Sequence, residues 1–268
     1  MGMRISAAVR FALAGAFLTA VLSSCTPAHP AYPAHPAHPA HRGQPIPAAQ
    51  PVAPDPRVGA VFLGGGAMHT CSGAVLDSPA GDLILTAAHC LAGDVDARFV
   101  PGLDGGVPPE DGRPIEAVYL DPRWVRDQDP LADYAIARVR AVDGDGLEAV
   151  ADGGLRLGTT PAAGTDVTVT GYAAGVGGGQ ATCRAPTEPA RQGFSVLRCG
   201  GLVAGFSGAP WITGSMVSGV IGGLDGGGCA DEVSYSAPFD GAVAALLARA
   251  EAGGPGDEVP TVSDDGCG

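Results

Sequence analysis

The chain has 268 residues, of which 46% are apolar and 16% are charged, so it contains enough apolar side chains for a substantial core. The formal net charge is −13 at pH 7, and all 15 cationic side chains are arginine. An acidic chain of this kind repels phosphate backbones, which argues against nucleic acid as a partner.

The first 24 residues have the features of a leader for export. Arg4 and Arg10 give the start a positive charge, and an apolar run follows from Phe11 to Leu22. This run is shorter than the roughly 20 residues that a membrane-spanning helix needs. It ends in LSSC, which resembles the bacterial lipobox, so Cys25 is expected to carry a lipid and to begin the mature chain. The alternative is an ordinary signal peptide with a chance cysteine, in which case the protein is secreted.

Residues 25–57 are rich in proline, alanine and histidine. Proline every two or three residues favours an extended polyproline II conformation, which cannot build a core. We therefore expect a stalk that holds the folded part away from a membrane. Its histidines offer metal ligands, but an extended segment has no fixed cage for an ion, so neither a metal site nor a cofactor is expected. These histidines are His29, His35, His38 and His41.

Residues 58–252 contain short alternating apolar runs separated by Gly, Asp and Pro. Runs at this spacing, without helical periodicity between them, indicate an all-β sandwich or barrel. An Asp- and Gly-rich gap, Val142–Gly154, divides the runs into two sets of similar size. The sequence therefore predicts two β modules.

One helix is predicted after the second module. Asp240 is a suitable N-cap, apolar residues follow at helical spacing from Val243 to Ala250, and Gly253 ends the pattern. The remaining residues, 253–268, are acidic and rich in turn formers, so we expect a flexible tail apart from Cys267.

Seven cysteines in an exported chain suggest disulfides. The sequence alone leaves many pairings open, and pairing between neighbours is the simplest. No pair has the CxxC spacing of zinc ligands, which disfavours a zinc site. If Cys25 is lipidated, an even number remains, namely Cys71, Cys90, Cys183, Cys199, Cys229 and Cys267.

A candidate nucleophile lies in the segment GLVAGFSGAPW, where Ser207 is surrounded by small residues. A serine hydroxyl attacks efficiently when a base takes its proton, and this base is usually histidine. Outside the stalk the chain offers His69 and His89. His69 lies in a Gly-rich turn and is interpreted as a surface or hydrogen-bonded loop residue. His89 follows a strand that is expected to be buried, and it is the candidate base.

The imidazole in turn needs an acceptor that fixes its tautomer and stabilises its charged form. Asp127 and Asp129 lie in a polar loop, the usual place for a solvated carboxylate. Asp133 opens the alternating strand DYAIARV, where it can be held at the rim of a core. Asp133 is therefore the candidate acceptor.

The segments LTAAHC, DYAIARV and GFSGAPW resemble the His, Asp and Ser motifs of the chymotrypsin-fold (trypsin-like) serine proteases. The resemblance covers most of residues 58–247 and is closest to the bacterial branch that includes glutamyl-endopeptidase-like enzymes. The order His, Asp, Ser also excludes the α/β-hydrolase and subtilisin arrangements. The resemblance implies two antiparallel six-stranded β-barrels followed by the C-terminal helix.

The resemblance also implies roles for residues near the candidate triad. The backbone N–H groups of Gly205 and Ser207 are expected to form the oxyanion hole, each worth roughly 3 kcal/mol, and the glycines around Ser207 are expected to leave clearance for substrate. A Cys71–Cys90 disulfide is expected beside His89. Cys183–Cys199 and Cys229–Cys267 are the remaining pairs.

By position in the family, Gly201 is expected at the base of the pocket for the P1 side chain of the substrate. Gly222, Gly223 and Leu224 are expected along its wall. Neither a carboxylate nor a histidine is present at these positions, which favours a small or apolar P1 residue over a basic one or glutamate.

Two positions depart from the family pattern. Phe206 replaces the acid that pairs with a freed N-terminus in trypsin-type activation, so that salt bridge is not expected here. Gly222 replaces the serine that often supports the catalytic aspartate.

These patterns together predict an exported, lipid-anchored serine endopeptidase that acts as a monomer on polypeptides through an acyl-enzyme. One alternative is a surface binding or scaffolding lipoprotein that retains the protease fold without turnover. Another is metal capture by the histidine stalk.

Overall fold

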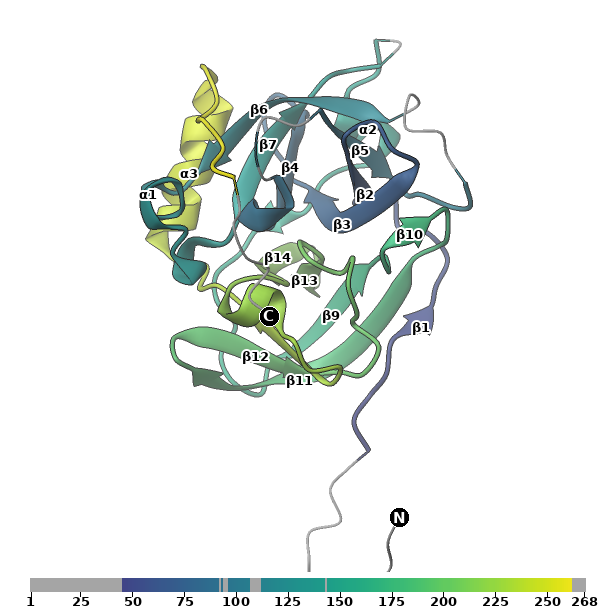
Figure 1. The fold of residues 1–268 in the computed structure, drawn as a ribbon, viewed down its shortest axis with the longest axis vertical. Helices are drawn as coiled ribbons and strands as arrows, with labels where there is room; N and C mark the ends of the chain where they lie inside the picture. The colour runs from purple at the N-terminus through teal and green to yellow at the C-terminus, as the bar shows by residue number, and fades with distance from the viewer. Residues whose placement is uncertain (1–44, 92, 94–95, 107–111, 143, 262–268) are drawn as a thin grey trace, which may run out of the picture. The chain divides into compact units, whose positions relative to one another are not determined.

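A computed structural model describes residues 45–91, 93, 96–106, 112–142 and 144–261. Two β-sheets, one above the other in Figure 1, form the framework of this part of the chain. The expected leader, the lipidation site Cys25, the four stalk histidines and Cys267 lie outside the described residues. Among the described residues, no helix is long and apolar enough to cross a membrane.

The first sheet closes into a six-stranded antiparallel barrel, because β3 pairs with β4 as well as with β2. The short strand β10 (Gly175–Val176) pairs with β3 from outside. The barrel strands are β2 (Val58–Leu63), β3 (Met68–Val75), β4 (Leu83–Thr86), β5 (Ala97–Pro101), β6 (Arg113–Leu120) and β7 (Ala135–Val139).

The second sheet has the strand order β15-β12-β11-β9-β13-β14-β8, and β1 pairs with β11 beside it. Its pairs are antiparallel except β14 with β8. All-β architecture and a chymotrypsin-like fold are confirmed. The strands are β1 (Gln50–Pro51), β8 (Arg156–Leu157), β9 (Asp166–Gly171), β11 (Ala181–Arg191), β12 (Phe194–Arg198), β13 (Pro210–Thr213), β14 (Met216–Val220) and β15 (Val233–Ser236).

Each sheet encloses its own apolar cluster. Val61, Ile84 and Phe99 are buried inside the first barrel, and Val169 and Trp211 are buried in the second module. The alternating runs place every second side chain on the inner face of a strand, which is why the pattern predicted the fold class.

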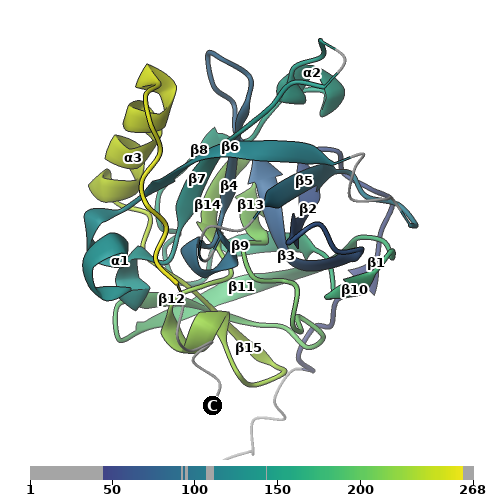
Figure 2. The ribbon, with the colours of Figure 1, turned by 45° about the horizontal axis from the view of Figure 1, so that its top comes forward.

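The helix predicted near the end of the chain is confirmed as α3 (Gly241–Ala252). The Asp240 carboxylate accepts a hydrogen bond from the Ala242 N–H at 2.8 Å. Val243, Leu246 and Ala250 are buried against a cluster that includes Tyr134, and α3 therefore lies along the first barrel (Figure 2). The other helical segments are short: η1 (Ala88–Leu91), α1 (Pro122–Asp127), η3 (Pro130–Ala132), α2 (Leu147–Val150) and η4 (Leu224–Gly227).

The folded part extends beyond both expected boundaries, residues 58 and 252. On the N-terminal side, the Ala49 N–H donates to Gly200 O at 2.8 Å, and β1 adds to the second sheet. This part of the expected stalk is therefore a strand rather than polyproline II. On the C-terminal side, the Asp257 carboxylate accepts a hydrogen bond from the Leu120 N–H at 2.7 Å and pairs with Arg249. These contacts fix the start of the expected flexible tail against β6.

Asp121 links the loop after β6 to the residue that follows Asp133. Its side chain is buried and accepts hydrogen bonds from the Arg123 N–H and side chain, and from the Tyr134 hydroxyl at 2.7 Å. Burial by itself raises the pKa of Asp121, but the hydrogen bonds from Arg123 and Tyr134 outweigh it and lower the pKa to about 2.

Acid titration tests this network. The pKa of Asp121 is lowered to about 2 in the folded protein. The stability that this carboxylate contributes is therefore complete above its unfolded pKa of about 4 and is lost as the pH falls toward 2. We expect Asp121→Asn to lower the free energy of unfolding at pH 7 by about 1 to 3 kcal/mol and to remove part of the loss between pH 4 and pH 2. Urea unfolding at these pH values measures both effects.

The matched control is Asp127→Asn, because this carboxylate is exposed and pairs with Arg126 on the surface of α1. It is expected to leave the pH dependence of the wild type unchanged. An Asp121→Asn protein that loses as much stability between pH 4 and pH 2 as the wild type contradicts the assignment.

Candidate active site

Ser207 lies in the loop between β12 and β13, at the junction of the two modules. Its carbonyl oxygen accepts a hydrogen bond from the Ser72 N–H on β3 at 2.8 Å. The Gly208 N–H donates to Ile221 O at 2.7 Å. Backbone contacts from both modules therefore fix the loop, and the Ser207 side chain is left partly exposed.

The glycines on either side of Ser207 are required by the protein's own backbone. Gly205 has φ of 98°, and a Cβ there meets Ala174 N at 2.0 Å. Gly208 has φ of 77°, and a Cβ there meets Ser72 O at 2.2 Å. Side chains at both positions are excluded by backbone conformation and by backbone atoms. Packing of the chain therefore requires both glycines, and Gly205 also borders the cavity described below.

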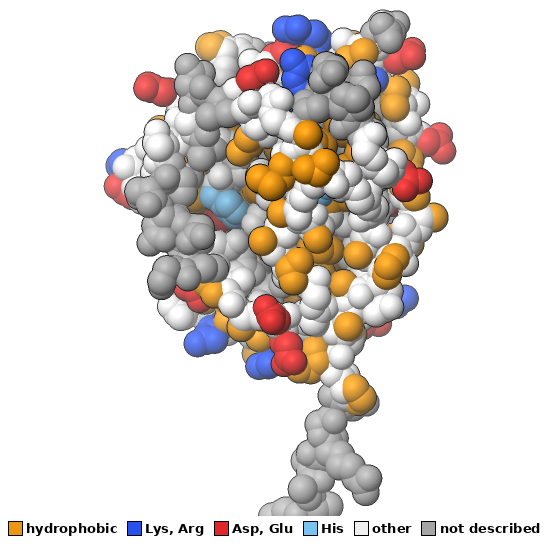
Figure 3. Space-filling view, turned by 45° about the vertical axis from the view of Figure 1, so that its right-hand side comes forward, with side chains coloured by type: hydrophobic (Ala, Val, Ile, Leu, Met, Phe, Trp, Pro, Cys, Tyr) orange, Lys and Arg blue, Asp and Glu red, His pale blue; other side chains and the backbone are white. Residues whose placement is uncertain are grey.

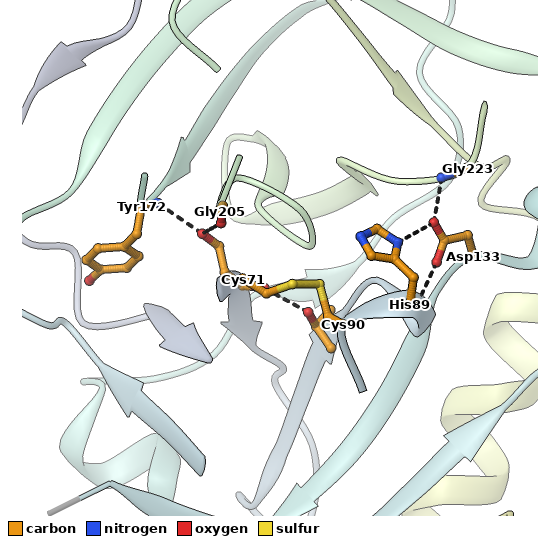
Figure 4. The surroundings of a disulfide bond; sticks show 9 residues. Cys71, His89, Cys90, Asp133, Tyr172, Gly205 and Gly223 are labelled. Atoms are coloured by element: carbon orange, nitrogen blue, oxygen red, sulfur yellow. Dashed lines mark hydrogen bonds and ion pairs between the residues drawn. A yellow bond between two sulfur atoms is a disulfide. The ribbon is translucent and has the colours of Figure 1, made fainter. Parts of the chain in front are cut away.

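His89 lies on η1, the helical turn that follows β4. Asp133 directly follows η3, and one residue, Tyr134, separates it from β7. The Nδ1 atom of His89 lies 2.8 Å from Oδ2 of Asp133, and the His89 N–H donates to Oδ1 at 3.0 Å. Asp133 therefore holds both the ring and the backbone of His89 (Figure 4).

A third donor reaches Asp133 from the second module. The Gly223 N–H donates to Oδ2 at 2.7 Å. The Asp133 carboxylate is buried, which by itself raises its pKa, but the attraction of His89 and the hydrogen bonds from His89 and Gly223 lower the pKa below its usual value. An ionised Asp133 accepts a hydrogen bond from Nδ1 of His89, which keeps the proton of the neutral ring on Nδ1 and leaves Nε2 as the nitrogen that can act as a base.

His89 and Ser207 border the same cavity, of about 520 Å³. In the space-filling view, histidine atoms reach the surface beside a group of hydrophobic side chains (Figure 3). The first barrel contributes Leu63, Thr70, Cys71, His89 and Cys90 to the cavity wall. The second module contributes Leu202–Gly205, Ser207, Ile221 and Gly226–Asp231. The three candidate residues from distant parts of the chain thus meet at one cavity, with Asp133 behind His89.

The four residues expected to form the P1 pocket are placed beside the cavity rather than on its wall. Gly201 is exposed, and a Cβ there lies 3.5 Å from Ala49. Gly222 and Gly223 lie against Asp133, and Leu224 packs against the cluster that contains Phe194. Their sequence neighbours Leu202, Ile221 and Gly226 line the cavity instead.

His69 is buried on β3, so the expected position on the surface or in a loop is wrong, whereas the alternative that it is hydrogen-bonded agrees with the structure. Its Nε2 atom lies 2.8 Å from Gly177 O, and its ring packs edge-on against Phe62 and Tyr172. The glycine-rich turn lies at Gly64 and Gly65 and ends before Met68, so His69 lies within the strand that follows it.

Two disulfides are present among the described cysteines, Cys71–Cys90 and Cys183–Cys199. Cys71–Cys90 joins β3 to η1 and so ties the turn that carries His89 to the barrel. Cys229 is also disulfide-bonded, and Cys267, its expected partner, lies outside the described residues. Cys71, His89 and Cys90 also lie close enough together to suggest a metal site, but the disulfide occupies both sulfur atoms.

Sequence reasoning missed Ser72 and the backbone of Gly223. Ser72 directly follows Cys71, so the sequence places it near the site, but its side-chain partners come from loops 100 and 133 residues away. Gly223 acts through its backbone N–H, which every residue except proline has, so its role cannot be predicted from the residue type.

The family model described as the trypsin-like peptidase domain matches residues 71–222, which is more than half of the chain. These residues include His89 and Ser207 and most of the cavity wall. A comparison with curated proteins finds no significant match.

Solved structures with the same fold are distant in sequence. The protease Anisep from Arthrobacter nicotinovorans is 21% identical with a TM-score of 0.66, covering 76% of this chain and 100% of that chain. A Glu endopeptidase is 15% identical with a TM-score of 0.60, covering 78% and 99%. Human heparin binding protein is 19% identical with a TM-score of 0.58, covering 79% and 100%. At these identities the likeness establishes the fold.

Gly222 provides a test of how tightly Asp133 is held. A Cβ at this position lies 2.9 Å from Asp133 Oδ2 and 3.1 Å from Asp133 O. Three hydrogen bonds hold the carboxylate, so it cannot move away without losing them. We expect Gly222→Ala to lower the free energy of unfolding by about 1 to 3 kcal/mol, measured by chemical denaturation.

Gly241→Ala serves as the control, because this glycine opens α3 and a Cβ there meets nothing within 4 Å. It is expected to leave stability unchanged or raise it slightly. Equal stabilities of the two variants contradict the tight fit at Gly222.

Proposed function

The chain belongs to the trypsin-like peptidase family, and from that premise we propose that it is an exported serine endopeptidase that acts through Ser207, His89 and Asp133. The observation that carries the proposal is the buried Asp133 carboxylate on Nδ1 of His89, next to the cavity that His89 shares with Ser207. This arrangement gives a serine the oriented base that nucleophilic attack requires.

In the proposed reaction, the Ser207 Oγ attacks the carbonyl carbon of the scissile peptide bond, and His89 Nε2 takes the hydroxyl proton. The Gly205 and Ser207 N–H groups stabilise the resulting oxyanion. His89 then gives its proton to the leaving amine as the C–N bond breaks, which leaves an acyl-enzyme on Ser207. A water molecule activated by His89 releases the second product by the same steps in reverse.

Asp133 is expected to remain ionised throughout this cycle. Its lowered pKa keeps it negative, so it stabilises the imidazolium that forms at each proton transfer. The Gly223 N–H donates a hydrogen bond to this carboxylate from the residue next to Gly222. Gly222 therefore does not leave Asp133 without support.

Activation does not need a freed N-terminus in this proposal. Phe206 is buried in the apolar cluster that contains Trp211, where a charged amino group has no partner. Val58 is buried as well, and its N–H donates to Asp55 O at 3.0 Å within an uncut chain. The segment Asp55–Val58 is thus fixed without cleavage.

The walls of the P1 pocket are assigned to Leu202, Ile221 and Gly226–Gly228, beside the residues expected from the sequence. These groups are apolar or lack side chains, which supports a small or apolar P1 residue. Asp231 at the rim is exposed.

Export is supported by the disulfides, which form and persist in oxidising compartments. Anchoring through a lipid on Cys25 rests on the LSSC pattern of the leader. The substrate is a polypeptide, and the proposed enzyme acts as a monomer.

A non-catalytic binding protein with this fold is the alternative, and human heparin binding protein has a related structure. Heparin is a polyanion, whereas this chain has a formal charge of −13, so charge opposes a ligand of that kind. A binding protein also has no need of a buried carboxylate oriented on a histidine.

Labelling with a fluorophosphonate probe tests the proposal, because the probe reacts with an activated serine. We expect the wild-type protein with an intact Arg57–Val58 bond to be labelled, and mass spectrometry to place the adduct on Ser207. Ser207→Ala and His89→Ala are expected to lose labelling by at least about 1,000-fold in rate.

Ser195→Ala is the matched control, because Ser195 is a buried serine on β12 away from the cavity. It is expected to be labelled at the wild-type rate. A folded wild-type protein that is not labelled favours the non-catalytic binding protein. Labelling that appears only after cleavage at Arg57 contradicts the proposal that the enzyme is active without a new N-terminus.

A further inference from the structure

We propose that Ser72 is a positioning residue that holds the proposed oxyanion hole in its active conformation; this rests on the proposed peptidase function. Ser72 lies on β3 of the first barrel and is fully buried. Its Oγ atom donates a hydrogen bond to Gly205 O and accepts one from the Tyr172 N–H, each at 2.9 Å. The side chain thus joins two loops of the second module.

The backbone of Ser72 contacts the second proposed donor residue. Its N–H donates to Ser207 O at 2.8 Å, while its Oγ atom holds Gly205 O. Both residues whose N–H groups are assigned to the oxyanion hole therefore have their carbonyl groups bound by Ser72. One barrel strand fixes both donors across the junction between the modules.

The peptide that carries the Gly205 N–H is held from its opposite side. The carbonyl group of Ala204 belongs to the same planar peptide, and it accepts a hydrogen bond from the Ala174 N–H at 2.7 Å. In a trans peptide the C=O and N–H groups point in opposite directions, so this contact directs the Gly205 N–H away from Ala174. Ser72 binds the Tyr172 end of the same loop and keeps the two loops together.

A clamp of this kind is needed because glycine rotates easily. Gly205 has φ of 98°, and without a Cβ it allows the preceding peptide to turn over at low cost. Turning that peptide over exchanges its N–H for the carbonyl oxygen of Ala204, which repels an oxyanion. The hydrogen bond from Ala174 holds this peptide directly. Ser72 fixes the next peptide through Gly205 O and holds the loop of Ala174 through Tyr172, so the two residues together maintain a preorganised donor.

Ser72→Ala separates the two contacts, because it removes Oγ and retains the backbone N–H that binds Ser207 O. We expect kcat on a peptide substrate to fall roughly 10- to 100-fold while KM changes less than about threefold. The affinity for a peptide boronic acid, which mimics the tetrahedral intermediate, is expected to fall by about the same factor as kcat/KM.

Ser236→Ala is the matched control. Ser236 is also buried, and its Oγ atom likewise accepts from one backbone N–H, of Val220, and donates to one carbonyl, of Ala237. It is expected to lose a similar amount of thermal stability and to keep the wild-type kcat. The comparison separates lost stability from lost positioning.

Ala174→Pro tests the other end of the clamp at an exposed residue. It removes the N–H that binds Ala204 O and is expected to lower kcat without a matching change in KM. If Ser72→Ala does not fold, this variant tests whether the hydrogen bonds that hold the Gly205 loop are needed for kcat. An active wild-type enzyme whose kcat stays within about twofold in the folded variants overturns the role of Ser72. A wild-type protein that neither hydrolyses peptides nor reacts with a fluorophosphonate overturns the proposed function itself.

Discussion

The buried carboxylate of Asp133 is the constraint on which the rest of the site depends. Removing this charge from water is costly, and it is tolerated because three N–H donors surround it. Two of these donors belong to His89 and one to Gly223. The same contacts orient the imidazole and join the first barrel to the second module, so the position of the base and the junction of the modules are fixed together.

On the opposite side of Ser207, uncharged hydrogen-bonding groups fix the Gly205 loop in the way that Asp133 fixes His89. Ser72 and Ala174 hold the loop that contains Gly205, and the hydrogen bonds of Ser72 to Gly205 and Tyr172 cross the junction. In both places a glycine is present because neighbouring atoms fill the space of a side chain. The site is therefore built from backbone packed between two rigid sheets, and the chemistry needs few side chains.

The sequence predicted what short-range patterns encode. Alternating apolar residues predicted the strands, and Asp240 with the apolar spacing that follows it predicted α3. Three short motifs identified the candidate residues His89, Asp133 and Ser207. It did not predict the cavity wall, the burial of His69 or the support of Asp133 by Gly223. These depend on backbone groups and on loops that meet through the fold. The ordered start of the tail was missed because the Asp257 carboxylate accepts a hydrogen bond from the Leu120 N–H on β6, more than a hundred residues away.

Replacing Asp133 by asparagine, which preserves its size, tests most directly whether the buried carboxylate makes His89 a base. The amide presents an N–H to His89 and favours the tautomer in which Nε2 carries the proton, so the ring can no longer act as a base. The measurement is kcat of Asp133→Asn on a peptide substrate near neutral pH, with circular dichroism to verify the fold. We expect a loss on the order of 10,000-fold in a folded protein. A folded variant within about tenfold of the wild-type kcat contradicts this expectation.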